Sequence, residues 1–199
     1  MQKNPVNILI ALLFSLLIPA FGYHFLGLLY AVVFLVGYLG GFILWVLFPS
    51  NASWASLKVP YWLTLIAFLL LHKVEENRMA FFEVVSEKIT GGTVPGLSAG
   101  LIVGLAVLPI GAWLAVPSLI KRGQELGYYS AWTLFVSMGV AELAHFVFPF
   151  LTQEPYGYFP GMFSVVVLAP LAWWGIARLI GNDRRKVSDP LEPKTLSKK

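Results

Sequence analysis

Histidines and glutamates stand at helical spacing inside two apolar stretches of the chain. One stretch holds the run His72-Lys73-Val74-Glu75-Glu76, and another holds Glu142 and His145. Ionisable side chains inside a bilayer are costly, and they mostly serve a function there. Imidazole and carboxylate groups bind divalent transition metals, and both can also act as general acids or bases. The two groups together therefore predict one intramembrane site.

The spacing within each group lets its side chains share a helix face. Residues three and four positions apart lie on the same face, and Glu-x-x-His pairs supply ligands to carboxylate-bridged two-metal sites in helical bundles. Two His with one Glu is also a ligand set of zinc hydrolases. We therefore expect a divalent ion, Zn or Fe first and Mn as a further option. The predicted metal ligands are His72, Glu75, Glu76, Glu142 and His145.

The composition indicates an integral membrane protein. Hydrophobic residues make up 58% of the 199 positions and charged residues 12%, whereas soluble domains carry about a quarter charged residues. The chain has no cysteine, which excludes disulfides and thiolate ligands. The net charge of +4 comes mainly from the ends and one loop, so it concerns membrane topology, and we expect no nucleic-acid partner.

Six stretches have the length of about 20 mostly apolar residues that a transmembrane helix needs. They cover roughly 6–23, 25–48, 60–87, 94–118, 128–151 and 159–180, with Pro60 as a suitable first helical residue. We therefore predict an all-α polytopic bundle of about six transmembrane helices that forms one domain over residues 1–180. Residues 181–199 form a basic tail that we expect to be disordered.

The distribution of lysine and arginine predicts that both termini are cytoplasmic. Lys3, Lys58, Lys121 and the basic tail then share the inner side, and the loop with Glu154 falls outside. With a rise of about 1.5 Å per residue, the two polar groups reach similar depths. We expect the site between the third and fifth helices, in the outer half of the membrane.

An electrostatic explanation competes for part of the site. Lys73 and Arg78 could neutralise Glu75, Glu76 or Glu83 in an ion-pair network at the membrane edge. Glu142 and His145 lack such neighbours in their own stretch and need partners from elsewhere. We expect His24 to be an interfacial histidine and Glu83 to be solvated.

The chain resembles the HXXEE-motif family of small bacterial integral membrane proteins. The resemblance has three parts in order: the run from His72 to Glu76, then His145, then Tyr158-Phe159-Pro160-Gly161. It covers the third predicted helix to the start of the sixth. The family is of unknown function and suspected to be enzymatic, so the resemblance implies a bacterial plasma membrane and site residues rather than a reaction.

The leading hypothesis is a metal-dependent enzyme, most readily a hydrolase, acting on a lipid or another lipophilic molecule. Glu75 or Glu76 would be a second ligand or general base, and the Tyr158 hydroxyl could donate to a developing oxyanion. Three alternatives stay open. They are a di-iron-type lipid oxidase or desaturase, a metal-free acid/base isomerase or cyclase of an isoprenoid-like lipid, and a proton or metal-ion carrier, which would need to form a homo-oligomer.

Overall fold

The structure is a computed structural model that describes residues 3–92, 96 and 98–187. The described residues form helices and no strands, and six helical spans are long and apolar enough to cross a membrane, as the sequence predicted. The elements are α1 (Pro5–Leu26), α2 (Leu28–Leu47), α3 (Trp54–Ile66), η1 (Ala67–His72), α4 (Lys73–Arg78), α5 (Phe81–Val85), η2 (Ser86–Thr90), α6 (Ala99–Ile102), η3 (Val103–Val107), α7 (Leu108–Lys121), α8 (Glu125–Gly139), η4 (Ala141–Leu143), α9 (Ala144–Val147), η5 (Phe148–Leu151) and α10 (Met162–Val187).

The third span begins earlier and ends earlier than predicted. The Ser53 side chain accepts a hydrogen bond from the Ser56 amide at 3.3 Å and caps the helix before Trp54, so Pro60 lies inside the helix instead of starting it. α3, η1 and α4 then run on as one span to Arg78. Ala80 adopts a left-handed conformation (φ 52°) that separates α4 from α5. The predicted helix over 60–87 is therefore two helices.

Both spans that carry the candidate residues contain an irregular turn beside them. In the third span, η1 is a π-helical turn that ends at His72. In the fifth span, α8 stops at Gly139, and a 3-10 turn from Ala141 to Leu143 contains Glu142. Such departures from regular α-helix recur at functional sites because they re-aim side chains. Each of them here adjoins a metal-ligand candidate.

The central helix of the bundle is α8, which packs against α2, α7 and α10. All of its residues from Gly127 to Gly139 are buried. The close contact with α2 depends on small residues, because a Cβ added to Gly41 would lie 2.7 Å from the Thr133 backbone. Gly37 meets Ser137 in the same way. These glycines of α2 thus permit the close approach of α8.

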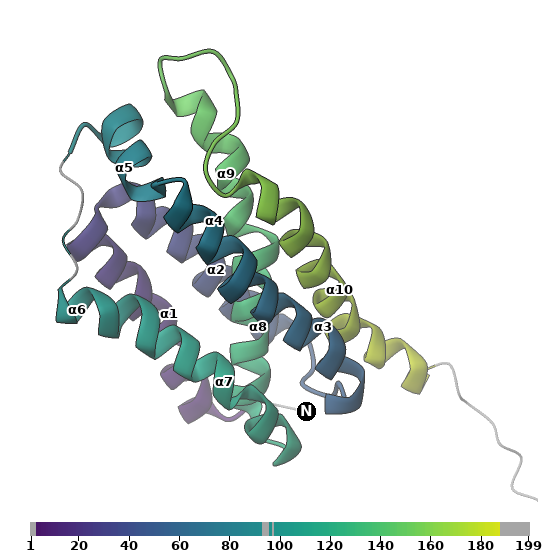
Figure 1. The fold of residues 1–199 in the computed structure, drawn as a ribbon. Helices are drawn as coiled ribbons and strands as arrows, with labels where there is room; N and C mark the ends of the chain where they lie inside the picture. Colours follow the sequence, from purple (N-terminus) through teal and green to yellow (C-terminus); the bar gives the residue numbers. More distant parts are fainter. Residues whose placement is uncertain (1–2, 93–95, 97, 188–199) are drawn as a thin grey trace, which may run out of the picture.

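The two ends of the bundle differ. The N-terminus and the late part of α10 lie at one end, and α4, α5 and α9 lie at the other (Figure 1). α10 packs against α3 and α8 and continues to Val187, past its predicted end near residue 180. The rest of the predicted disordered tail, residues 188–199, lies outside the described residues. The orientation of the bundle across the membrane stays a prediction.

Candidate metal centre

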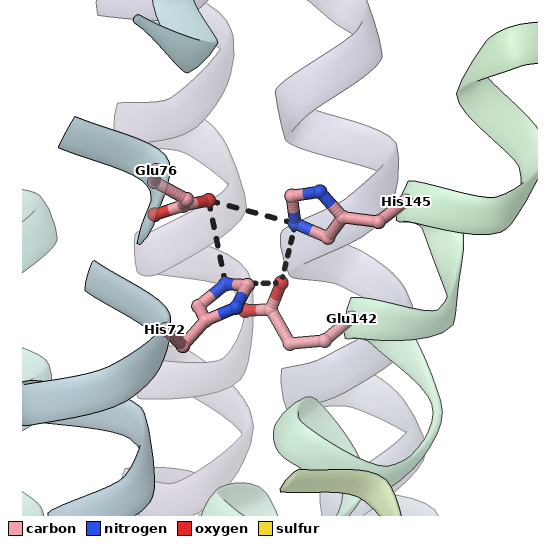
Figure 2. A group of neighbouring side chains, drawn as sticks. All are labelled: His72, Glu76, Glu142 and His145. Carbon is pink, nitrogen blue, oxygen red and sulfur yellow. Dashed lines mark hydrogen bonds and ion pairs between the residues drawn. The ribbon is translucent and has the colours of Figure 1, made fainter. Parts of the chain in front are cut away.

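Four of the five predicted ligands come together. His72 ends η1, Glu76 belongs to α4, Glu142 to η4 and His145 to α9. Each can offer one ligand atom so that all four atoms lie within 4.8 Å of one another. Figure 2 shows the two imidazoles and the two carboxylates converging on a common centre. The site therefore lies between the third and fifth spans, as predicted.

The distances within this group suit one metal ion. Nε2 of His72 lies 3.2 Å from the nearer Glu142 oxygen and 3.4 Å from the nearer Glu76 oxygen. Nε2 of His145 lies 3.2 and 3.5 Å from the same two oxygens. A tetrahedral ion with bonds of about 2.0–2.2 Å separates its ligand atoms by roughly 3.3–3.6 Å. The four distances between an imidazole nitrogen and a carboxylate oxygen are thus close to the spacing that a tetrahedral ion requires.

Hydrogen bonds on the far side of each ring aim the Nε2 atoms inward. Nδ1–H of His145 donates to the Pro160 carbonyl at 2.5 Å. The Ser164 hydroxyl donates to the Gly161 carbonyl at 3.1 Å, so its oxygen is free to accept from Nδ1–H of His72 at 2.8 Å. An outer partner of this kind fixes the tautomer of a metal-binding histidine and leaves the Nε2 lone pair for the ion.

The four side chains are largely shielded from solvent. His72 and His145 are 0% and 1% exposed, and Nε2 of His72 has no hydrogen-bond partner among the described residues. Its nearest polar neighbours are the Glu76 and Glu142 oxygens, which are acceptors like the unprotonated nitrogen itself, and a metal ion would satisfy both. The residues present therefore fit a divalent ion with a His₂Glu₂ ligand set.

Glu75 is not brought into this group. Its carboxylate accepts hydrogen bonds from the backbone amides of Gly161, Phe163 and Ser164 at 3.2, 3.2 and 2.6 Å. These amides belong to the start of α10, where the first four N–H groups lack helical partners and favour a negative charge. The Glu75 carboxylate thus caps α10, although the sequence offered it as a ligand or base.

Tyr158 also lies outside the group. Its hydroxyl donates to the Glu75 carboxylate, and the side chain is exposed. Desolvation and, next, the Glu75 carboxylate raise the pKa of Tyr158 to about 12, so the hydroxyl stays a donor at neutral pH. The contact supports a positioning role in place of the predicted oxyanion contact.

The loop before α10 forms a wall of the site. Gly161 has φ 95°, and any Cβ at this position would collide with the His145 ring. Pro160 receives the His145 hydrogen bond, and Phe159 is buried against Phe81 and Phe148. The Tyr-Phe-Pro-Gly run therefore holds His145 and Glu75 in place.

A cavity of about 590 Å³ opens beside the centre. Its walls are mostly apolar and come from α1, α2, the third span, α5, the α6–α7 span and the fifth span. Lys73, Glu76 and Glu142 line it, and the two imidazoles do not. Lys73 forms an ion pair with Glu76 and lies 5.0 Å above the Phe68 ring. The volume is within the usual range of about 300–1,000 Å³ for small-molecule sites, so the carboxylates face a space that a ligand can occupy.

The remaining candidates lie outside the centre. His24 contacts the Phe25 ring at 4.6 Å, while Glu83 is exposed and lines the cavity. Ser164, the partner of His72, was not predicted from the sequence, because a serine in an apolar helix has no distinguishing pattern.

A scan against protein-family models finds no match for this chain, and neither curated proteins nor solved structures give one. The likeness to the HXXEE-motif family rests on its three sequence parts. The structure links these parts physically, because Glu75 and His145 both bind the loop that contains Pro160 and Gly161.

Proposed function

We propose that the protein is a membrane-embedded, metal-dependent hydrolase that acts on a lipophilic substrate. The observation that carries the proposal is the convergence of four ligand atoms within 4.8 Å beside a largely apolar cavity. Because the cavity lies among helices that are apolar enough to span a membrane, the substrate would reach it from the lipid phase.

The ligand set favours a single ion, with zinc or iron as the best candidates. A two-metal oxidase would draw on both Glu75 and Glu76 as bridges, but Glu75 is engaged by the α10 amides and Tyr158. When bound, a divalent ion polarises a carbonyl group and lowers the pKa of water towards neutrality.

Two side chains would act at the edge between the centre and the cavity. Glu76 directs one oxygen to the imidazoles and the other to Lys73, so it can accept a proton from water that attacks the substrate. The Lys73 ammonium also lines the cavity and can neutralise negative charge that develops on a substrate oxygen. The two histidines, Glu142 and the imidazole-facing oxygen of Glu76 would hold the ion.

Metal analysis of the purified protein tests the proposal. We expect close to one zinc or iron per chain in wild type, and its loss in the His72→Ala, His145→Ala double variant. His24→Ala is the matched control, because it removes the third histidine, which lies outside the group, and it should retain the metal. Thermal melting of each variant separates metal loss from unfolding.

Activity is measured next on long-chain p-nitrophenyl esters, before and after chelation. Hydrolysis that disappears with the metal and returns on adding it supports the proposal. Full activity in metal-free protein would instead indicate acid/base chemistry by the Glu and His side chains. Ion flux through liposomes without hydrolysis would indicate a carrier.

We also propose that both termini are cytoplasmic, on the basis of the lysine and arginine distribution. A protease-cleavable tag at the C-terminus, tested in inside-out and right-side-out vesicles, checks this orientation. Cleavage in right-side-out vesicles alone would reverse it and place the centre in the inner half of the membrane.

A further inference from the structure

Two buried hydroxyl groups line the cavity without hydrogen-bond partners. Tyr38 of α2 and Ser137 of α8 are 2% and 6% exposed, and both belong to the cavity wall. Neither hydroxyl oxygen makes a hydrogen bond to any described residue. Buried polar groups are satisfied in the great majority of cases, so two unpartnered hydroxyls in the wall of one cavity point to a polar group that is supplied from outside the chain.

The polar side chains around them are already engaged with one another. The Ser15 hydroxyl donates to the Tyr38 backbone carbonyl at 3.2 Å and accepts from the Tyr129 hydroxyl at 2.8 Å. The Trp113 indole, which stacks on the Tyr38 ring at 6.3 Å, donates to the Thr133 hydroxyl at 3.2 Å. The Ser15, Trp113 and Thr133 side chains are therefore engaged within the chain, whereas the Tyr38 and Ser137 hydroxyls are not.

These hydroxyls lie deeper in the bundle than the metal centre. Trp113, which stacks on Tyr38, also contacts Phe68, and Phe68 stacks in turn on His72. Ser137 precedes Glu142 by five residues, which corresponds to about 7 Å along a helix axis. A ligand that fills the cavity would thus meet carboxylates at one level and neutral hydroxyls at another, with apolar walls between them.

We propose that the cavity binds a single-chain lipid that carries a second oxygen function, a hydroxyl or a carbonyl, part of the way along its chain. The Tyr38 and Ser137 hydroxyls bind this oxygen, since each can both donate and accept a hydrogen bond. That the other polar end of the lipid reacts at the His₂Glu₂ group rests on the proposed function. The binding of the mid-chain oxygen does not.

The binding preference has a physical basis. A site built to hydrogen-bond a ligand oxygen rejects the analogue that lacks it, because its own buried polar groups are then left unpaired. We expect an oxygenated chain to bind about tenfold more tightly than the plain chain, the ratio that one to two neutral hydrogen bonds supply.

The experiment measures competition in purified full-length protein in lipid nanodiscs. A fluorescent fatty acid, 11-(dansylamino)undecanoic acid, is displaced by stearic acid or by stearic acids with a hydroxyl group at successive mid-chain positions. In wild type, at least one position should bind about tenfold more tightly than stearic acid. In the Tyr38→Phe, Ser137→Ala double variant, all the acids should bind within about twofold of each other.

Thr64→Val is the matched control. The Thr64 hydroxyl is also buried and without a partner, but Thr64 does not line the cavity, so this variant should keep the wild-type preference. Each single variant, Tyr38→Phe and Ser137→Ala, is measured as well, so that a preference remains testable if the double variant fails to fold.

The outcomes separate this proposal from the proposed function. The His72→Ala, His145→Ala variant should keep the preference for the hydroxylated chain even though it has lost metal. Equal affinity of all the acids for wild type would overturn the inference and indicate that water satisfies both hydroxyls. A preference that survives in the Tyr38→Phe, Ser137→Ala variant, or no displacement by any of the acids, would overturn it too.

Discussion

Glu75 and Glu76 are neighbours in the chain, yet their carboxylates meet opposite surroundings. Glu75 accepts hydrogen bonds from three backbone amides and the Tyr158 hydroxyl at the start of α10. Glu76 faces two imidazole nitrogens and the Lys73 ammonium, and it lines the cavity. One carboxylate is saturated by fixed donors, whereas the other is next to groups that exchange protons or bind metal.

The difference shows how one helical turn can serve two purposes. Successive residues of an α-helix point about 100° apart, since a turn contains 3.6 residues. Glu76 therefore shares the His72 face at i, i+4, while Glu75 turns towards α10. Through Ser164 the two arrangements are joined, because its amide binds Glu75 and its hydroxyl accepts from His72. Ser164 therefore contributes both to the capping of α10 and to the orientation of the His72 ring.

The largest effect is expected when the two glutamates are exchanged for glutamine one at a time. Glu76→Gln should weaken metal binding by more than the 10–100-fold that is typical for the loss of an outer partner, with little change in melting temperature. Glu75→Gln should retain most of the metal but lower stability by about 1–2 kcal/mol, because part-buried amide donors at a helix start exchange a charged acceptor for a neutral one. Metal titration measures the affinity of both variants for the ion, and thermal melting measures their stability.

The opposite result would exchange the roles assigned to Glu75 and Glu76. Metal loss in Glu75→Gln together with normal metal binding in Glu76→Gln would make Glu75 the ligand, and the α10 cap would then be secondary.

A smaller effect is expected from the loop that positions His145. Gly161→Ala places a methyl group against the His145 ring and imposes strain at φ 95°. We expect the ring to shift and the metal affinity to fall by roughly 10–100-fold, as for the loss of an outer-shell partner. Gly157→Ala is the matched control in the same loop, where the nearest heavy atom to an added Cβ is the Pro155 carbonyl oxygen at 3.7 Å. Equal affinities in the two variants would show that the loop does not set the position of His145.

The sequence was sufficient to predict the bundle and four members of the centre. Helical spacing paired His72 with Glu76 and Glu142 with His145, and the cost of lone intramembrane charges required the two pairs to meet. The same spacing could not separate Glu75 from Glu76, since both lie within a turn of His72. Their separation depends on contacts with α10, which is about 85–90 residues away in the chain and which periodicity does not encode.

The helix boundaries that were not predicted from the sequence have causes of two kinds, one local and one tertiary. The Ser53 cap is a recognisable start signal, and it outweighed the proline seven residues later. The break at Ala80 has no such signal, because alanine rarely adopts φ 52° and no glycine or proline marks the position. Tertiary packing of α5 beside the centre, with Phe81 against His145 at 5.0 Å, has to impose that turn.

The smallest expected effect tests the Tyr158–Glu75 contact through its pH dependence. The folded state raises the pKa of Tyr158 to about 12, from an ordinary value near 10. Because the protonated hydroxyl is the favoured form, its stabilising contribution is present in full below about pH 10 and is lost as the pH rises towards 12. The melting temperature of wild type should therefore exceed that of Tyr158→Phe slightly at pH 7–9, and the difference should shrink above pH 10.

In a Glu75→Gln background, tyrosinate absorbance should show Tyr158 titrating at a lower pH, though still above 10, since desolvation is the larger cause of the shift. An unchanged titration in that background would mean that the carboxylate and the hydroxyl do not interact, and Glu75 would then cap α10 through the backbone amides alone.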